Sequence, residues 1–376
     1  MKLKRSGVRQ EVGGRAVAVL AVLPDYRSSF VSELRSALAE TDTNLTIVAG
    51  DEHLDASVKS APHDGVISVR NRALLGRSLL WQVGALRYLR DTDVAVVDLN
   101  PRSLTAWIVL ITRKARRRRT LVWGHILPRR GVNAHTAPLR RRMRRLADGV
   151  ISYTWSDADI VTREDPDVPV WVAANGLYRE VDLGFDEGGR GRFRMLYVGR
   201  IEPSKKPLLA LEAFAIACNE LDLEKSVRLT FVGRGSQLPA LRQRAQELGL
   251  AERVDILGSI TDYERLRRLY GETIASLSPG YVGLSLTQSL GFGVPMVVGR
   301  DEPHAPEIEL LSSSTGRTFP GDDAHALGAE LVWCSLHVAE WDRKSIVNTV
   351  RSRYSSTAMA RGFEMALRGV EQRDAR

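Results

Sequence analysis

Two cations on one predicted loop could bind a diphosphate. Met195–Val198 is a short apolar run that stops at Gly199, which predicts a buried parallel strand followed by a loop. Arg200 and Lys205 lie on that loop, where open α/β sheets bind ligands. A guanidinium presents a planar fork to two phosphate oxygens, and an ammonium adds a compact positive charge. The alternative is that both are solvated loop cations, and Lys206 could be confused with Lys205.

A second strand and turn predict the other side of the same site. The apolar run Ile274–Leu277 precedes a turn at Gly280, and then Gly283 and a helix that begins near Leu284. A helix N-terminus offers free N–H groups and the positive end of the helix dipole, which together attract anions. We therefore expect Gly283, Leu284 and Ser285 to present backbone N–H groups to the diphosphate. The alternative is an ordinary N-cap formed by Ser285.

Further candidates lie where other predicted strands end. Gly233 belongs to a Gly-Arg-Gly loop that we expect to line a cleft, and Gly258 and Ile260 follow the next strand. His125 follows the apolar run 120–123, although a lone histidine is usually structural or exposed. No His, Cys, Asp or Glu residues have metal-ligand spacing, so we expect no protein-built metal site. The absence of a complete G-x-G-x-x-G after a strand disfavours a nicotinamide dehydrogenase.

A parallel sheet is needed to position these loops. Strands alternate with helical patterns, which predicts βαβ units. The strands are expected near 15–23, 45–48, 66–69, 94–97, 120–123, 149–152, 168–173, 194–198, 227–232, 253–257, 274–277, 294–298 and 317–319. The helices are expected near 28–39, 78–90, 103–116, 138–147, 207–220, 237–248, 262–270, 284–291, 305–311 and 323–336.

The length of the chain indicates two domains, because 376 residues exceed what one core usually supports. The polar, glycine-rich stretch 186–191 is typical of a linker. We predict an α/β fold of two doubly wound, Rossmann-like domains that face a central cleft. The N-terminal domain would span 1–185 and the C-terminal domain 186–340, and the helices in 341–376 would cross back to the first domain.

The composition points to a cytosolic protein with an acidic partner. Apolar residues make up 44% and charged residues 26%, but the net charge of +9 is unusually positive. Cys218 and Cys334 lie in apolar helical contexts and are expected to be reduced. The basic N-terminus lacks the apolar core of a secretory signal, and no apolar run reaches the roughly 18 residues that span a bilayer.

A basic tract predicts contact with the cytosolic face of a membrane. The stretch Arg113–Arg145 is rich in arginine and lysine and has no acidic residue, and the apolar stretch Leu104–Ile111 precedes it. Cations beside an apolar helix suit an anionic leaflet, at roughly 1 kcal/mol per cation near the surface. The alternative is that the helix belongs to the core and the arginines form a solvated face. Nucleic-acid binding is disfavoured, because aromatic residues are scarce in the tract.

Several short motifs in a fixed order resemble the bacterial glycosyltransferase family 4, over roughly residues 120–340. The motifs are Asn175-Gly176, Gly199-Arg200 with Lys205, Phe231–Gly235, Val254–Gly258, Gly293–Pro295, Pro306–Ile308 and Gly316–Asp322. The resemblance implies the GT-B fold and retaining, metal-independent transfer of a sugar from a UDP- or GDP-linked donor, with no other cofactor. Arg200 and Lys205 would then be catalytic, together with His125 near the donor sugar, while Gly199 and Gly233 would line the donor site.

The resemblance also has departures. The family usually carries two glutamates eight residues apart, where this chain has Gly280 and Gln288. It looks like a branch that reads Gly-x-Val-Gly-Leu here, in which Glu307 would contact the sugar and Gln288 a ribose hydroxyl. Gly258 and Ile260 would frame the nucleobase. The loop Pro24–Arg27 replaces paired glycines that many members place near the acceptor, so the acceptor must be held differently.

The sequence therefore predicts a retaining glycosyltransferase of bacterial surface glycan synthesis, acting on a lipid-linked or glycan acceptor. Two alternatives stay open. A GT-B nucleotide-sugar epimerase would form its product without an acceptor. A catalytically degenerate transferase fold would serve as a binding or scaffold subunit, as the absent glutamates at positions 280 and 288 would permit.

Overall fold

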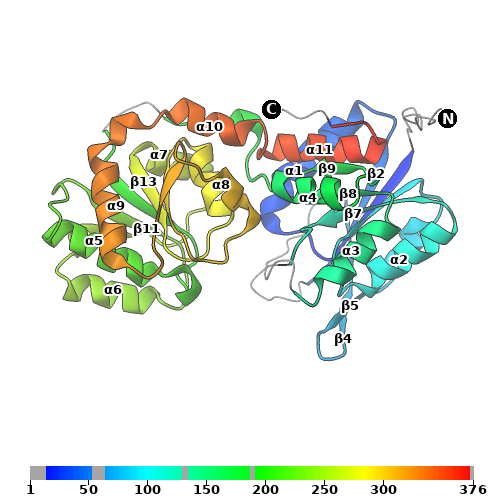
Figure 1. The fold of residues 1–376 in the computed structure, drawn as a ribbon, viewed down its shortest axis with the longest axis horizontal. Coiled ribbons are helices and arrows are strands. Elements are labelled where there is room, and N and C mark those ends of the chain that lie inside the picture. The colour runs from blue at the N-terminus through cyan, green and yellow to red at the C-terminus, as the bar shows by residue number, and fades with distance from the viewer. Residues whose placement is uncertain (1–13, 53–63, 129–133, 187–190, 373–376) are drawn as a thin grey trace. The chain divides into compact units, whose positions relative to one another are not determined.

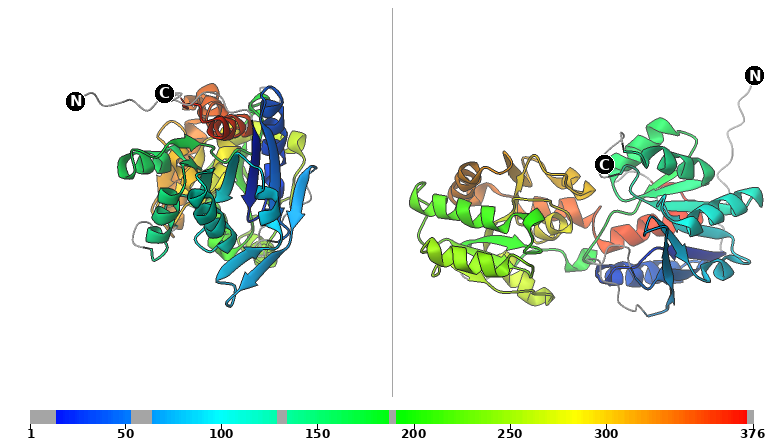
Figure 2. Two further views of the ribbon diagram at one scale, coloured as in Figure 1. Left: turned by 90° about the vertical axis from the view of Figure 1, so that its right-hand side faces the viewer. Right: turned by 90° about the horizontal axis from the view of Figure 1, so that it is seen from below.

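The computed structural model describes residues 14–52, 64–128, 134–186 and 191–372. The chain forms two units, coloured in chain order in Figure 1, and each is described by itself. The first unit comprises residues 1–180 and 353–376, and the second comprises residues 181–352. Both have a parallel sheet with helices on its two faces (Figures 1 and 2).

The sheet of the first unit has the strand order β3-β2-β1-β6-β7-β8-β9, and all its pairs are parallel. Its strands are β1 (Arg15–Leu20), β2 (Asn44–Gly50), β3 (Val66–Val69), β6 (Val94–Asp98), β7 (Arg119–Gly124), β8 (Gly149–Ser152) and β9 (Val170–Val172). The chain adds β2 and β3 on one side of β1 and then β6 on the other. The strand order therefore reverses between β1 and β6, which is where such sheets bind ligands.

Helices bury both faces of this sheet, because residues along each strand point alternately to opposite sides. The helices are α1 (Ser28–Ala39), α2 (Leu104–Ala115), α3 (Ala137–Leu146), α4 (Trp155–Glu164) and α11 (Ser356–Arg368). Ala16, Ala18 and Leu20 of β1 join a core with α1 and α11. Val17 and Val19 join a core that α2, α3 and α4 cover.

Two regions of the first unit differ from expectation. The helix expected at 78–90 is wrong: β4 (Asn71–Leu74) and β5 (Leu79–Gln82) form an antiparallel hairpin, visible at the lower edge of Figure 1, and a 3-10 helix η2 (Ala85–Leu89) follows. Gly76 and Gly84 have positive φ, which interrupts a helix. Helix α4 was not expected, although Thr154 caps it by accepting a hydrogen bond from the backbone of Asp157.

The second unit repeats the architecture, with the strand order β12-β11-β10-β13-β14-β15. Its strands are β10 (Arg194–Val198), β11 (Arg228–Val232), β12 (Val254–Ile256), β13 (Thr273–Ser278), β14 (Met296–Gly299) and β15 (Gly316–Phe319). Its helices are α5 (Pro207–Asn219), α6 (Leu238–Glu247), α7 (Tyr263–Gly271), α8 (Leu284–Gly291), α9 (Ala324–Leu336) and α10 (Arg343–Arg351). The segment expected to be helical at 305–311 forms a 3-10 helix, η6 (Pro306–Leu310).

The unit boundaries fall at 180/181 and 352/353, rather than at 185/186 and 340/341. Helix α10 belongs to the second unit, where Arg343 donates hydrogen bonds to the carbonyls of Phe292 and Gly293. Helix α11 belongs to the first unit, because Met359 and Phe363 fill the core beside α1. None of the described helices is long and apolar enough to cross a membrane.

Candidate functional site

The loops after β10 and β13 meet at the carboxyl edge of the second sheet. These two strands are neighbours and the strand order reverses between them, so their loops lie at the position where open sheets bind ligands. The backbone N–H of Tyr281 donates to the carbonyl of Ser204, at 3.2 Å. The ammonium of Lys205 donates to the carbonyl of Tyr281 and lies 4.3 Å from the centre of its ring. Lys205 is thereby held at Tyr281, three residues before the first residue of α8.

The two adjacent lysines have different surroundings. Lys206 forms ion pairs with Glu302 and with Asp322, the latter at 2.7 Å, and so joins the loops that follow β10, β14 and β15. Lys206 also has a φ of 50°, in the left-handed region. The ion pairs make Lys206 a structural residue, and Lys205 is the lysine that faces α8.

Arg200 lies on a loop whose backbone is well fixed. The hydroxyl of Tyr197 donates to the carbonyls of Arg200 and Lys205, at 3.0 and 3.3 Å. Burial raises the pKa of Tyr197, so this hydroxyl stays protonated. The Arg200 side chain is exposed and forms no hydrogen bond or ion pair with the described residues. The loop is therefore rigid while its guanidinium is available to a ligand.

Helix α8 begins with an uncapped turn. Gly283 is the N-cap and no side chain caps the helix, so the alternative of an N-cap formed by Ser285 is wrong. The backbone N–H groups of Gly283, Leu284 and Ser285 donate to no other group within the described ranges. These are the three amides that the sequence predicted to face a diphosphate. Because no described acceptor takes these three N–H groups, they can donate to a bound anion.

His304 holds this turn in place, a role that sequence reasoning missed. Its Nδ1 accepts a hydrogen bond from the N–H of Val282, at 3.1 Å, and its Nε2 donates to the carbonyl of Gly299, at 2.6 Å. Burial lowers the pKa of His304, which favours the neutral ring that this arrangement requires. The signal in the sequence was its place just after the strand that ends at Gly299.

The absence of a carboxylate at position 280 follows from packing. A Cβ on Gly280 would clash with the carbonyl of Ser204 and lie 2.8 Å from the Cα of Lys205. Gln288 lies on α8, and its Oε1 accepts a hydrogen bond from the hydroxyl of Tyr270, at 3.4 Å. Glu307 lies on η6, where it is 4% exposed. The close approach of the two loops thus excludes any side chain at 280, whereas 288 and 307 keep polar groups beside α8.

The glycines of the other loops shape the same edge. Gly233 has a φ of 156° and packs so closely on the carbonyl of Gly199 that no Cβ fits. Its N–H donates to the carbonyl of Gly258, at 2.8 Å, which links the loops after β11 and β12. Gly258 has a φ of 71° with open space around it, and Ile260 is 9% exposed. Gly233 therefore positions the Arg200 loop, while the surroundings of Gly258 leave room for a ligand.

His125 belongs to the first unit and follows β7. Its ring lies 4.7 Å from that of Tyr153, and its carbonyl accepts a hydrogen bond from Arg140, at 2.5 Å. Arg27, after β1, and Asp98, at the end of β6, lie at the same carboxyl edge of the sheet, and sequence reasoning assigned neither to a site. Burial raises the pKa of Asp98 to about 6.

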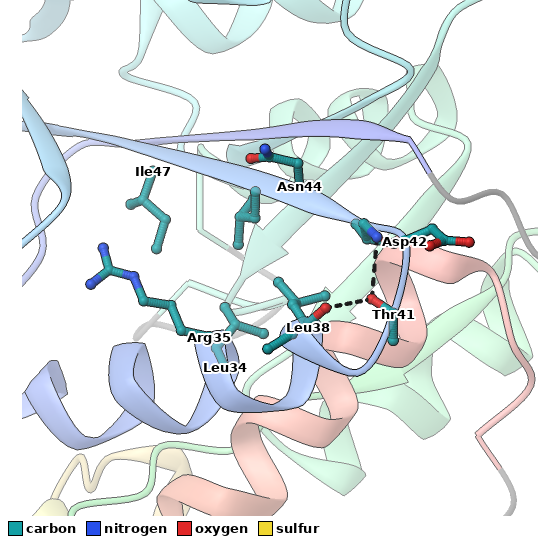
Figure 3. A pocket seen from close by; sticks show the side chains of 10 residues that line it. Leu34, Arg35, Leu38, Thr41, Asp42, Asn44 and Ile47 are labelled. Atoms are coloured by element: carbon teal, nitrogen blue, oxygen red, sulfur yellow. Dashed lines mark hydrogen bonds between the residues drawn. The ribbon is translucent and has the colours of Figure 1, made fainter.

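A cavity of about 440 Å³ lies away from these edges, between α1 and the start of β2 (Figure 3). Its lining combines apolar and polar residues, and the labelled polar residues include Arg35 and Thr41, whose hydroxyl donates to the carbonyl of Leu38. Because β2 begins here, the cavity lies at the amino end of the sheet, opposite the carboxyl edge. Within the described parts of the chain, no group of three His, Cys, Asp or Glu side chains could hold a metal ion.

Comparisons with known proteins agree with this architecture. Residues 187–333 match the family model described as glycosyl transferases group 1, and the curated proteins gave no match. Among solved structures, the lipopolysaccharide outer core galactosyltransferase WaaB in its apo form has a TM-score of 0.67 at 12% identity, over 94% of this chain and 99% of that one.

Two further structures extend the comparison. HepE from Anabaena in complex with UDP has a TM-score of 0.66 at 14% identity, over 95% of this chain and 100% of that one. Sucrose-phosphate synthase from Thermosynechococcus elongatus has a TM-score of 0.61 at 17% identity, over 94% and 98%. At these identities the likeness concerns the fold. The α/β class and the GT-B fold predicted from the sequence are confirmed.

Proposed function

We propose that this chain is a retaining glycosyltransferase, which moves a sugar from a UDP- or GDP-linked donor to a glycan or lipid-linked acceptor in bacterial surface glycan synthesis. The observation that carries the proposal is the meeting of Lys205 with the uncapped start of α8, on a loop that also bears Arg200. The match of residues 187–333 to group 1 glycosyl transferases supports it. HepE, a similar structure, was solved with UDP-glucose.

The arrangement suits departure of a nucleoside diphosphate. As the bond to the anomeric carbon breaks, negative charge grows on the leaving phosphate oxygens, and groups fixed in advance around those oxygens lower the barrier. The amides of Gly283, Leu284 and Ser285 would donate to them, with Lys205 beside them and Arg200 as an exposed cation on the same loop. Gly258 and Ile260 would border the base, Gln288 the ribose, and Glu307 and His125 the sugar.

Binding and turnover test this proposal separately. A UDP- or GDP-sugar that binds the folded chain should raise its melting temperature. Arg200→Ala and Lys205→Ala should each remove about 2–4 kcal/mol of transition-state stabilisation, read from kcat/KM. Lys206→Ala should mainly lower the melting temperature, and Lys225→Ala, on an exposed loop, should change neither.

The outcomes separate three functions. Full turnover by the Arg200→Ala, Lys205→Ala double variant would contradict the assignment. Conversion of the donor without an acceptor would favour the epimerase. Donor binding without transfer or hydrolysis across a wide acceptor panel would favour a binding subunit. That alternative arises because this chain has Gly280 and Gln288 where glutamates are expected.

We further propose that α2 and α3 touch an anionic membrane, where a lipid-linked acceptor would be presented. The two helices pack together, and α2 exposes Ile108 (37%) and Ile111 (55%). Helix α3 exposes Leu139 (44%). The exposed cations around them include Arg116, Arg117, Arg141, Arg142 and Arg145. Co-sedimentation with anionic vesicles measures this contact.

Other residues of the basic tract have structural roles. Arg113 and Arg144 are 6% and 2% exposed, and Arg144 forms ion pairs with Glu164 and Asp165. Arg119 donates to the carbonyls of Ala366 and Leu367. Only part of the stretch Arg113–Arg145 is therefore free to meet a membrane.

A further inference from the structure

The carboxyl edge of the first sheet contains a buried cation that the proposed chemistry does not use. Arg27 ends the short 3-10 helix η1 (Asp25–Arg27) that follows β1, and it is 6% exposed. Its Nη2 donates to the hydroxyl of Tyr153 and to Oδ1 of Asn175, each at 2.9 Å. Its guanidinium carbon lies 4.5 Å from the ring centre of Trp123 and 5.1 Å from that of Tyr153. Residues at the ends of β7, β8 and β9 thus fix this one side chain.

Not all N–H groups of the Arg27 guanidinium form hydrogen bonds with the described residues. Its Nε is fully buried and has no hydrogen-bond partner among the described residues, and no hydrogen bond from Nη1 is formed there either. No carboxylate of the described chain lies within ion-pair distance of Arg27. Burying a charge without a partner is unfavourable. The unpartnered Nε alone does not set Arg27 apart, because Nε of Arg144 is also unpartnered although Arg144 forms ion pairs. What sets Arg27 apart is a buried guanidinium that has no ion pair among the described residues.

Arg113, in the same unit and equally exposed at 6%, shows the contrast. Its Nε donates to the hydroxyl of Thr120, and its two Nη atoms donate to Thr92, Asp93 and Arg119. The chain itself therefore satisfies Arg113, as it does a structural arginine. Arg27, by contrast, donates only through Nη2, and its Nε and Nη1 form no hydrogen bond with the described residues.

The surroundings of Arg27 are those of a ligand site. Asp98 ends β6, next to β1 at the point where the strand order reverses, and its carboxylate accepts the N–H of Ala21. It does not form an ion pair with Arg27, and burial raises its pKa to about 6. The ring of His125 lies 4.7 Å from that of Tyr153. A guanidinium that forms no ion pair with the described residues thus lies near a buried carboxyl group with a raised pKa, at the edge of the sheet where such folds bind ligands.

We propose that Arg27 binds an anionic group, a phosphate or a carboxylate, of the molecule that accepts the sugar. The identification of that molecule as the acceptor rests on the proposed function, whereas the anion site itself does not. A planar guanidinium matches two oxygens of either group. The short 3-10 helix η1 after β1 supplies this cation.

Phosphate binding tests the site directly. Inorganic phosphate is titrated by calorimetry at constant ionic strength into the full chain carrying Arg200→Ala and Lys205→Ala, so that the candidate diphosphate site is disabled. We expect one binding event to remain and to weaken by about tenfold to a hundredfold when Arg27→Gln is added, the usual loss for a charge-assisted hydrogen bond. Adding Arg113→Gln instead is the matched control, and phosphate affinity should not change.

Every outcome bears on the proposal. Absence of phosphate binding in the Arg200→Ala, Lys205→Ala chain, or affinity unchanged by Arg27→Gln, would overturn it. If the glutamine variant does not fold, Arg27→Lys keeps the charge but not the fork, and should weaken binding by a smaller factor. Glycerol 3-phosphate and glucuronate, compared with neutral glycerol, decide which anion is preferred. Loss of donor binding in Arg200→Ala or Lys205→Ala would leave these results unaffected, so the two proposals fail independently.

Discussion

At the scale of single residues, His304 controls the geometry of the candidate diphosphate site from outside it. Its neutral ring accepts the N–H of Val282 and donates to Gly299, which ties the turn before α8 to the end of β14. Protonation of Nδ1 would remove the acceptor and bring a positive charge close to Lys205, whose charge already disfavours it. The amides of α8 are therefore oriented by a group that must stay uncharged.

The pH dependence of stability follows from the lowered pKa of His304. The unfolded chain takes up a proton near the ordinary value of about 6.5, and the folded chain does so only at lower pH. The stabilisation by His304 is thus present above about pH 6.5 and is lost as the pH falls further. His304→Ala should lower the free energy of unfolding by about 1–2 kcal/mol at pH 7.5, and by less at pH 5.5.

Denaturant unfolding of the two proteins at both pH values checks this expectation. The exposed His325→Ala variant is the control, with no pH-dependent difference from the unaltered chain. A deficit in His304→Ala that stays constant between pH 7.5 and pH 5.5 would show that the ring contributes packing alone.

Residue-level prediction from the sequence succeeded where the signal was local. The strand before Gly199 and the glycine at 283 placed Arg200, Lys205 and the start of α8 correctly on loops at one edge of a sheet. The lack of space for a side chain at Gly280 depends on contacts between residues far apart in the chain. The same is true of the burial of Arg27 without an ion pair among the described residues. No spacing within the sequence encodes such contacts.

At the scale of elements, α2 and α3 combine apolar and basic side chains on exposed surface. Ile108 and Ile111 are three residues apart and so share a face of α2. Arg116, Arg117 and Arg142 supply exposed charge nearby. Replacing these three arginines with alanine should weaken binding to anionic vesicles by roughly 3 kcal/mol, at about 1 kcal/mol per cation.

The vesicle experiment includes a matched apolar control. Ile111→Ser should weaken binding, whereas Leu336→Ser, 76% exposed in the second unit, should not. Binding to anionic vesicles should also fall as salt is added, because exposed charges are screened. Equal binding to neutral and anionic vesicles would contradict the proposed contact.

The elements of the second unit were predicted well, and those of the first unit less so. In the second unit glycines follow β10 and β11, and Asp262 caps α7 by accepting a hydrogen bond from the backbone of Arg265. In the first unit, the residues 78–90 have apolar spacing that fits either a helix or a strand. Leu80 and Gln82 are buried, so burial alternates with the two-residue period of a strand. The strand forms because β5 pairs with β4, a contact that the spacing alone does not reveal.

At the scale of the whole molecule, α11 completes the first unit from beyond the second. A chain that ends after Ser352 should lose protection from hydrogen exchange in β1, β8 and β9, because Met359, Phe363 and Leu367 fill their core. Phe363→Ala should destabilise the first unit by about 3–5 kcal/mol. Strands β10 to β15 serve as the internal control, and equal loss of protection there would mean that α11 supports both units.

The architecture was predictable because the alternation of strands and helices continues along the chain, but the division between units was not. The glycine-rich stretch 186–191 suggested one boundary, whereas the chain passes into the second unit at 180/181 and leaves it at 352/353. Both α10 and α11 have one apolar face. Which sheet each of them covers depends on the fit of side chains such as Arg343 and Phe363.

The position of α11 also sets an order of events on the ribosome. All strands of the first sheet emerge before any of the second, yet the apolar face that α11 covers stays open until residues 356–368 have been made. At about 5–20 residues per second, translation of the intervening segment takes roughly 10–35 s. The second unit is contiguous and has all its residues before α11 appears. A chaperone would therefore be needed most while the first unit has been synthesised without α11, because its apolar face is then exposed.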